Sequence, residues 1–231
     1  MSAPDCTPTL DGLLSYEQAL ERLLDAAQPL SETEAVPLRS ALGRVLAEPV
    51  VSAIDVPGWD YSAMDGYALR AADVPFAGTR LPVSQRLPAG AMPEPLSMGT
   101  AARIFTGAPI PPGADTVVMQ EVCTASDGVV TFDVGASTAE NIRRRGEDIT
   151  KGAEVLPSGL TLAPQHLGLA ASVGHPDVQV YRPLRVALFA SGSELVMPGE
   201  PLHSGQIYNS NLFTATALLR ALGCEVIDLG I

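Results

Sequence analysis

The sequence has 231 residues, of which 46% are hydrophobic, enough for a folded core and for more than one domain. Its formal net charge of −12 argues against a nucleic-acid-binding surface, which needs a basic face, and against a polybasic membrane anchor. The 21 glycines and 20 prolines predict many short strands joined by turns, at a content below the level that signals disorder.

The three cysteines, Cys6, Cys123 and Cys224, are odd in number and far apart, so they predict neither a metal site nor a disulfide framework. This usage fits a reducing cytosol. The first residues show no basic stretch followed by an apolar one, so no signal peptide is expected. No apolar run approaches the ~18 residues of a membrane span. We therefore expect a cytoplasmic protein without nucleic-acid or membrane partners.

The first predicted element is an amphipathic helix over residues 15–27. Ser15 and Gln18 form a capping-box pattern. Apolar residues follow at helical spacing, at Tyr16, Ala19, Leu20, Leu23, Leu24 and Ala27. Such a helix must pack on another part of the protein. Residues 31–52 mix extended and turn signals, including a strand over 45–51, and we interpret them as linker-like structure.

From about residue 52 to residue 134 the pattern is that of a β domain. Proline and glycine punctuate short strands, and two β-rich runs, 116–123 and 129–134, flank the turn sequence Ala-Ser-Asp-Gly128. Two such runs around a short polar turn predict a hairpin. We expect a small closed or strongly curled β domain.

A second helix is predicted over residues 160–174. Pro164 lies near its start and Gly174 just past its end, which is the usual asymmetry of helices. The three histidines of the chain show no ligand spacing, and we interpret them all as structural; they are His166, His175 and His203.

The last part of the sequence has an α/β pattern. The apolar runs 185–190 and 224–229 predict two strands, and a helical stripe over 211–222 lies between them, with Asn211 as its N-cap. A strand–helix–strand unit of this kind predicts parallel strands. Two strands and one helix cannot cover both faces of a sheet. We therefore interpret 184–231 as the first piece of an α/β domain and expect the native chain to continue beyond it.

The most informative stretch is residues 55–70, DVPGWDYSAMDGYALR. Its two turn signals, Pro57-Gly58 and Asp65-Gly66, predict a folded loop that carries three carboxylates, those of Asp55, Asp60 and Asp65. Clustered aspartate oxygens suit a hard cation such as Mg²⁺. The alternative interpretation, which these residue types favour when they are taken by themselves, is that the aspartates cap turns through their own backbone.

This stretch resembles the central motif of the molybdopterin molybdenumtransferase family, which comprises the MoeA proteins and the E domain of gephyrin. Members read close to DVPGFDNSAMDGYA. Trp59 and Tyr61 stand where many members have Phe and Asn, and these exchanges keep an aromatic and a hydrogen-bonding group. The resemblance covers essentially the whole chain but only the front part of a typical member.

The resemblance implies a multidomain α+β fold. Residues 1–30 would form a helix that packs on the α/β domain, and 31–52 with 142–183 an elongated linker-like domain. A mainly β domain, 53–141, would be inserted into that linker. Residues 184–231 would begin a three-layer, molybdopterin-binding α/β domain that is incomplete in this sequence.

Two further segments carry the resemblance. One is residues 103–115, RIFTGAPIPPGAD, which is similar to the family's R-I-x-T-G-A-P-x-P-x-G-A. The turn at Thr106-Gly107 leaves a hydroxyl and backbone N–H groups free, and these can hold an oxyanion. The alternative is that this turn is only the exit from a strand. NIRRRGED, residues 141–148, is similar to N-x-R-x-x-G-E-D. Its three arginines suit phosphate and oxyanion oxygens. The alternative is a surface turn neutralised by Glu147 and Asp148.

A last pair of segments lies in the α/β region. ASGSEL, residues 190–195, follows the first parallel strand, where ligands of open α/β sheets bind. It resembles the family's S-T-G-D-E-L, with Ser193 in place of the Asp while Glu194 keeps its place. Backbone N–H groups of its turn can bind phosphate, and Glu194 can reach a metal. QIYNSN, residues 206–211, matches G-x-[IV]-x-[DN]-[ST]-N, or is only an N-cap.

The resemblance implies a Mg²⁺-dependent transferase of molybdenum cofactor biosynthesis, which converts adenylylated molybdopterin and molybdate into molybdenum cofactor and AMP. The site residues that it implies are Asp65, Thr106 and Asp148 as catalytic, Arg143, Arg145, Ser191, Gly192 and Ser193 as substrate-binding, and Glu194 and Asp65 as metal ligands.

The resemblance also implies a homodimer. The active cleft would lie between the β domain of one subunit and the α/β domain of its partner, so that Asp65 and Glu194 meet only across the dimer. The alternatives are an inactive N-terminal fragment and a gephyrin-like protein-binding scaffold. The family's S-G-G-x-S-x-G stretch is absent here, so this chain alone is expected to be inactive. The residues do not discriminate molybdate from tungstate, since both are tetrahedral dianions.

Overall fold

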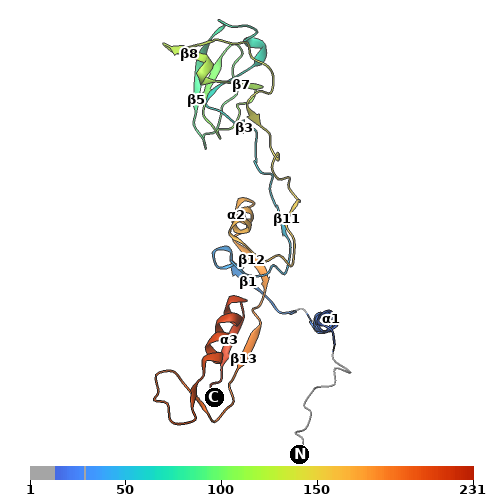
Figure 1. Cartoon of the computed structure of the whole chain (residues 1–231). Coiled ribbons are helices and arrows are strands. Elements are labelled where there is room, and N and C mark those ends of the chain that lie inside the picture. The colour runs from blue at the N-terminus through green and yellow to red at the C-terminus, as the bar shows by residue number, and fades with distance from the viewer. Residues whose placement is uncertain (1–13, 29) are drawn as a thin grey trace, which may run out of the picture. The chain divides into compact units, whose positions relative to one another are not determined.

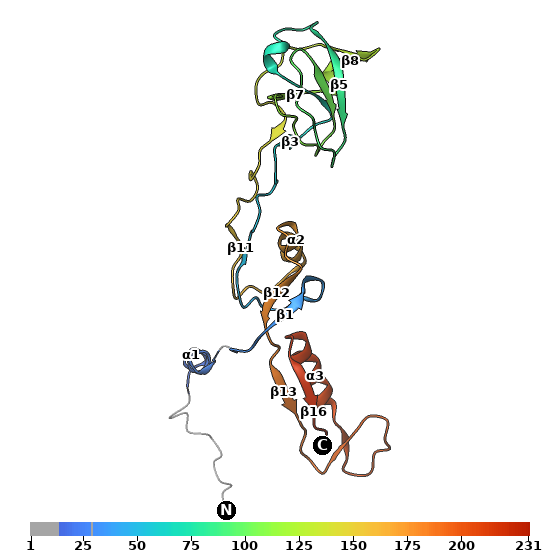
Figure 2. The ribbon, with the colours of Figure 1, turned by 180° about the vertical axis from the view of Figure 1, so that it is seen from behind.

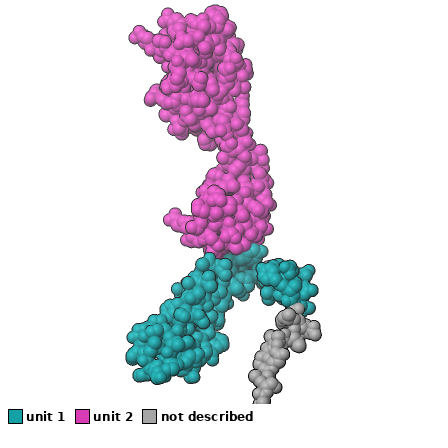
Figure 3. Space-filling model, viewed as in Figure 1, with its two compact units in different colours: residues 1–34, 181–231 teal, residues 35–180 magenta. Residues whose placement is uncertain are grey.

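The computed structural model describes residues 14–28 and 30–231 and mixes helices with strands (Figure 1). It divides into two compact units (Figure 3). Residues 35–180 form the larger unit, and residues 181–231 with the described part of 1–34 form the smaller one. None of the described helices combines the length and the hydropathy that a membrane span would need.

The larger unit contains a curled six-stranded sheet, as the run of short strands predicted. Its strand order is β7–β4–β6–β5–β9–β8, and neighbours are antiparallel except for β5 and β6. The strands and the two 3-10 turns beside them are β4 (Gly66–Leu69), η2 (Ala71–Asp73), β5 (Arg80–Leu87), β6 (Ala101–Ile104), β7 (Thr116–Met119), η3 (Gln120–Val122), β8 (Cys123–Ser126) and β9 (Val129–Phe132).

Strand β4 lies between the two hydrophobic clusters of the sheet. Side chains of a strand alternate between its faces. Tyr67 and Leu69 therefore pack in one cluster, where the ring of Tyr67 meets that of Phe132 edge to face at 6.1 Å. Ala68 packs in the other cluster, with Ile104. Because both faces are covered, every residue of β4 is buried.

A hairpin forms at the predicted turn sequence, as β8 and β9, but its first strand is Cys123–Ser126. The predicted partner strand is wrong: its first half is β7, which pairs with β4 at the other edge of the sheet. Ser126 is the register partner of Val129, so the turn consists of Asp127 and Gly128 alone. Both turn residues have positive φ, 54° and 77°. Two-residue hairpins need this conformation to match the strand twist, and an Asp-Gly pair adopts it readily. The strand expected over 116–123 is shorter than predicted, because η3 interrupts it after Met119.

Residues 50–62 and 142–156 run antiparallel beside each other, and we call them the paired segments (Figures 1 and 2). Their strands are β2 (Val50–Val51), β3 (Tyr61–Ser62), β10 (Ile142–Arg143) and β11 (Glu154–Leu156). β3 pairs with β10 at one end and β2 with β11 at the other. Between these pairs, the N–H of Val56 donates to the carbonyl of Ile149 at 2.7 Å.

The paired segments connect the sheet to a second hydrophobic core in the larger unit. The elements around this core are β1 (Thr33–Pro37), η1 (Leu38–Ser40), α2 (Pro164–Ser172) and β12 (Asp177–Tyr181). Its buried members are Ala41, Leu46, Val50, Leu156, Leu162, Ala170, Val173, Val178 and Val180. The strand expected over 45–51 is wrong in extent, because only β2 forms and Val45 and Leu46 make isolated bridges. Nδ1 of His166 accepts the N–H of Ala163 at 3.0 Å, a structural role.

The smaller unit contains the predicted strand–helix–strand unit. Its elements are α1 (Tyr16–Ala26), β13 (Arg185–Leu188), β14 (Leu195–Val196), β15 (Ile207–Tyr208), α3 (Ser210–Ala221) and β16 (Glu225–Asp228). β13 and β16 pair in parallel, as expected. Asn211 as the N-cap of α3 is wrong: Oδ1 of Asn209 accepts the N–H of Leu212. Two asparagines so close in sequence offer the same chemistry, and only the geometry of the helix start selects one.

The capping box of α1 is present. Ser15 Oγ accepts the N–H of Gln18 at 3.2 Å, and Gln18 Oε1 accepts the N–H of Ser15 at 3.1 Å. No residue of α1 is buried. The packing of its apolar stripe on the α/β domain therefore stays a prediction.

Gly66 has no room for a side chain, because β4 approaches β7 closely. A Cβ at Gly66 would lie 2.0 Å from the carbonyl oxygen of Val118. We expect Gly66→Ala to lower the free energy of unfolding by about 2 kcal/mol or more, since a backbone atom must move. The matched control is Gly168→Ala in α2, where no atom lies within 4 Å of the added carbon.

Gly168→Ala should raise the free energy of unfolding by about 0.5–1 kcal/mol, because glycine weakens a helix interior. Urea denaturation measures the free energy of unfolding of both variants. The same Gly→Ala substitution should lower it at Gly66 and raise it at Gly168. A Gly66→Ala variant as stable as the parent would contradict the close approach of β4 and β7.

Candidate functional site

The predicted pair Asp65 and Thr106 meets at one edge of the sheet. Asp65 directly precedes β4, and Thr106 lies two residues past β6. Gly66 and Ile104 are register partners, so the ends of these strands are neighbours. Asp65 Oδ1 accepts the N–H of Thr106 at 2.8 Å and its hydroxyl at 2.9 Å. Thr106 was expected to hold an oxyanion, and in this structure the oxyanion that it holds is a carboxylate of the same chain.

This arrangement keeps Asp65 ionised. The N–H of Thr106, then its hydroxyl, and the nearby Arg103 cation together hold the pKa of Asp65 below its usual value. Asp65 is half-buried and Thr106 is exposed. Among the described residues no donor bonds the second oxygen of Asp65. That oxygen can therefore accept from a substrate or bind a cation.

The three consecutive arginines are each engaged with carboxylates. Arg143 Nη2 donates to Asp148 Oδ1, and its Nε lies 3.1 Å from Glu147 Oε1 as an ion pair. Arg144 Nη1 donates to Asp60 at 2.6 Å. The acidic neighbours of the run thus neutralise Arg143, in agreement with the alternative interpretation for that residue.

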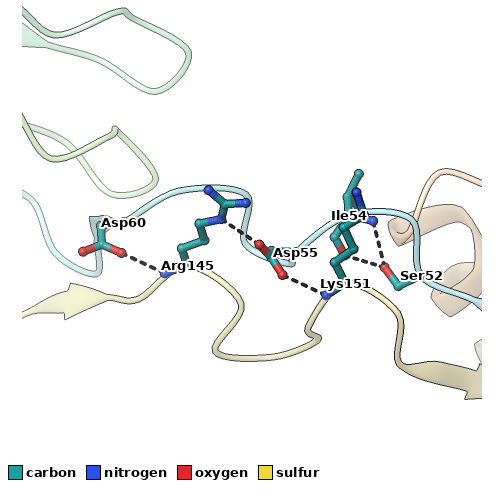
Figure 4. A network of polar contacts seen from close by, with 6 residues as sticks. All are labelled: Ser52, Ile54, Asp55, Asp60, Arg145 and Lys151. Atoms are coloured by element: carbon teal, nitrogen blue, oxygen red, sulfur yellow. Dashed lines mark hydrogen bonds and ion pairs between the residues drawn. The ribbon is translucent and has the colours of Figure 1, made fainter.

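Arg145 bridges two aspartates of the facing segment (Figure 4). Its backbone N–H donates to Asp60 Oδ1 at 2.8 Å and its Nε to Asp55 Oδ2 at 2.7 Å. The other oxygen of Asp55 accepts the N–H of Lys151 at 2.8 Å. Figure 4 shows Asp60, Arg145, Asp55 and Lys151 in sequence along the paired segments.

These bonds lower the pKa of the carboxylates. The N–H of Lys151 is the main cause for Asp55, followed by the Arg145 guanidinium. The N–H of Arg145, followed by Arg144, lowers the pKa of Asp60. The N–H of Arg144 is the main cause for Glu147. All these carboxylates are therefore anionic at neutral pH.

The three aspartates of residues 55–70 do not converge on one metal site. Asp55 and Asp60 belong to the arginine network and Asp65 to Thr106. Across the part of the chain that the structure describes, no three carboxylate, histidine or cysteine side chains group as a metal site. Nor do these aspartates cap their own turns, because their donors lie 41 to 96 residues away in sequence.

The predicted residues of the α/β region lie in the smaller unit. Ser191, Gly192, Ser193 and Glu194 form the turn between β13 and β14. The Glu194 carboxylate folds back over Gly192, so that a Cβ there would lie 2.6 Å from Glu194 Oε1. Glu194 is exposed. Its meeting with Asp65 across a dimer stays a prediction.

Sequence reasoning gave no role to Lys151 and did not predict the arginine partners of Asp55 and Asp60. The sequence does carry a signal for the first of these, because Lys151 is its only lysine and follows the arginine run closely. The sequence predicted the two aspartates as metal ligands or as turn caps, and neither role pairs them with arginines. Their arginine and N–H partners lie more than 80 residues away, and no local pattern reveals such a pairing.

Comparison with known proteins places these features in a family. The model of the MoeA N-terminal region (domain I and II) matches residues 14–174. A molybdopterin molybdenumtransferase of Haemophilus influenzae is 43% identical over 220 residues, which are 95% of this chain and 54% of that protein. One of a Nostoc species is 42% identical over 213 residues, 90% of this chain and 48% of that protein. This chain thus spans about half the length of the relatives that it matches.

A solved structure agrees with the sequence relatives. The crystal structure of the molybdopterin biosynthesis MoeA protein from Pyrococcus horikoshii OT3 superposes with a TM-score of 0.87 at 35% sequence identity. The match covers 95% of this chain and 60% of that one.

Acid should weaken the paired segments. Their carboxylates have a lower pKa folded than unfolded, so their stabilisation is complete above the unfolded pKa of about 4 and is lost as pH falls through the folded pKa. We expect the urea midpoint to stay level between about pH 5 and 7 and to fall below about pH 4.

The urea midpoint of Asp55→Asn should fall less steeply over the same acid range, because this variant lacks one of the titrating groups. Asp133→Asn, an exposed position just past β9, is the matched control and should follow the parent. Urea midpoints at a series of pH values measure all three proteins. Superimposable profiles for Asp55→Asn and the parent would show that Asp55 adds nothing to the acid sensitivity.

Proposed function

We propose, because this chain belongs to the family of the MoeA N-terminal region, that it forms the front part of a molybdopterin molybdenumtransferase. In the reaction that we propose, adenylylated molybdopterin and molybdate give molybdenum cofactor and AMP. Support comes from the names of the relatives from Haemophilus influenzae and a Nostoc species, which are 43% and 42% identical to this chain.

The observation that carries the proposal is the contact between Asp65 and Thr106. Ligand exchange at molybdate needs no covalent nucleophile; it needs fixed groups that place anionic oxygens and a cation that bridges them. Asp65 is ionised and is held at a fixed place by two bonds from Thr106. A rigid carboxylate with one unbonded oxygen fits this task, and Thr106 fixes its orientation.

We further propose Mg²⁺ as the cofactor, with Asp65 and Glu194 as its protein ligands. Mg²⁺ usually binds one or two carboxylates and completes its shell with water and substrate phosphates. The donor set fits that habit, because Asp65 has an unbonded oxygen and Glu194 is exposed. When bound, the cation would neutralise the charge of the adenylyl phosphate and molybdate oxygens.

The remaining site residues are proposed to bind substrate. Arg145 has two Nη groups with no partner among the described residues, and these suit a phosphate. Arg143 and Asp148 bind each other and would position one another. Ser191, Gly192 and Ser193 offer N–H groups in a turn beside a parallel strand end.

The finer architecture is part of the same proposal. The helix of 1–30 would pack on the α/β domain. Residues 31–52 with 142–183 would be the linker-like domain, 53–141 the β domain, and 184–231 the start of the molybdopterin-binding domain. A cytoplasmic homodimer in which Asp65 and Glu194 meet across subunits would complete the site. A gephyrin-like scaffold is the alternative, and the transferase names of the relatives do not favour it.

Asp65→Asn tests this proposal in the protein expressed from its complete reading frame. The substitution keeps the shape and removes the charge, so we expect a loss of molybdenum transfer of about 10²-fold. Thr106 can still donate to the amide oxygen, and the urea midpoint at neutral pH should change little. Asp133→Asn is the matched control and should transfer normally. Full activity of Asp65→Asn at limiting Mg²⁺ would remove Asp65 from the site.

A further inference from the structure

Arg103 begins the segment 103–115 that carries Thr106, and the proposed function gives it no part. It lies in β6 and is half-buried. Its register partners are Tyr67 on β4 and Arg86 on β5. Residues in register project from the same face of a sheet, so the side chain of Arg103 lies between these two side chains.

The guanidinium of Arg103 bonds to the chain on both sides of the Asp65–Thr106 contact. Its Nη1 donates to the carbonyl of Gly66 at 2.8 Å and to that of Ile104 at 3.1 Å. Gly66 directly follows Asp65 at the start of β4. Ile104 is the last residue of β6 and lies two residues before Thr106. One nitrogen thus ties together the two strand ends whose side chains form the contact.

The other terminal nitrogen of Arg103 holds the loop that precedes β4 through Gln120. Nη2 donates to Oε1 of Gln120. The N–H of Gln120 in turn donates to the carbonyl of Asp65 at 3.0 Å. The main chain at Asp65 is therefore fixed at two successive carbonyls, its own by Gln120 and that of Gly66 by Arg103.

Two aromatic rings hold the guanidinium in place. Its central carbon lies 4.4 Å from the ring centroid of Phe105 and 5.4 Å from that of Tyr67. A flat cation packed against rings has little freedom to turn. Arg86 also lies over Phe105, at 4.8 Å. Among the described residues, however, the side chain of Arg86 has no hydrogen-bond partner, so Arg86 shares the packing of Arg103 without its bonds to the strand ends.

We propose that Arg103 is a positioning residue for molybdenum transfer: its fork holds the ends of β4 and β6 so that the Asp65 carboxylate stays on Thr106. The inference rests on the proposed function, because it gives Arg103 a part in that reaction. Arg103 acts through Asp65 and does not itself contact the substrate. A reacting group that is displaced by about 1 Å can cost a hundredfold in rate, so this carboxylate needs a rigid support.

Arg103→Lys tests this role in the protein expressed from its complete reading frame. Lysine keeps the charge, but one ammonium group cannot bond both carbonyls and Gln120 while it lies flat against the rings. We expect kcat for molybdenum transfer to fall about tenfold, as for the loss of one charge-assisted bond, with KM unchanged within about twofold. Arg86→Lys is the matched control on the same ring and should transfer normally.

A second variant reaches the same bonds without changing the arginine. Gln120→Met removes the acceptor of Nη2 and keeps the backbone bond to Asp65, so kcat should fall about threefold. Urea midpoints at neutral pH check the fold of every variant. Equal losses in Arg103→Lys and Arg86→Lys would assign the effect to packing on Phe105 and overturn the proposal.

A double variant separates positioning from a general loss of structure. Asp65→Asn already removes the carboxylate that Arg103 supports. Adding Arg103→Lys should therefore lower the residual transfer of Asp65→Asn by no more than about twofold. A merely structural arginine would lower transfer by the same factor in both backgrounds, and that result would overturn the proposal.

The amide of Thr106 gives a readout that does not depend on activity. Its N–H donates to a carboxylate, so its proton should resonate at low field in the 231-residue chain labelled with ¹⁵N-threonine. Arg103→Lys should move this signal to higher field, while the amides of Thr116 on β7 and Thr131 on β9 keep their positions. An unmoved Thr106 signal would show that Arg103 does not position the contact.

Failure of this inference can be told apart from failure of the proposed function. If the complete protein transfers molybdenum but Arg103→Lys changes neither transfer nor the Thr106 amide, only the role of Arg103 is wrong. If the complete protein transfers no molybdenum while Arg103→Lys still moves the Thr106 amide, the transferase proposal is wrong and the support of Asp65 by Arg103 stands.

Discussion

Two carboxylates, those of Asp55 and Asp60, hold together stretches of chain that are 84 to 96 residues apart in sequence. Each accepts a backbone N–H and an arginine nitrogen from the facing segment. A carboxylate that accepts from a cation and from the main chain forms stronger bonds than a neutral group does. The strand pairs at the two ends of the paired segments have only two or three residues each. Between them, these polar contacts add to the backbone hydrogen bonds around Val56 and Ile149.

The paired segments position the candidate site residues of the larger unit. They lead directly into β4, whose first residue follows Asp65, and the close approach of β4 to β7 is possible because Gly66 has no side chain. The register of β4 with β6 then brings Asp65 to Thr106. The same segments present Arg145, Lys151 and Trp59 around one hollow. The Asp65–Thr106 contact thus directly follows the paired segments, and the hollow beside Arg145 lies on them.

Features that depend on neighbours in sequence were predicted well. The Asp127–Gly128 hairpin turn and the Ser15 capping box need only a few adjacent residues, and both are present. The parallel β13–β16 pair follows from a strand–helix–strand order that has one favoured geometry. Local patterns gave a wrong prediction where two neighbouring residues of the same type could fill the same structural role. The choice between Asn209 and Asn211 as N-cap is of this kind.

By itself, the sequence determined the family, the curled sheet and the residues on which a site could be built, because motif wording and strand periodicity are properties of short stretches. Only the tertiary structure decided what those residues do to one another. It separated Asp65 from Asp55 and Asp60, which a single loop had suggested would act together, and it assigned the latter two to arginines. It also brought Lys151 and Trp59 to one hollow. The reason is physical: the partner of a charged side chain is set by the chain path, and that path is fixed by contacts across more than 80 residues.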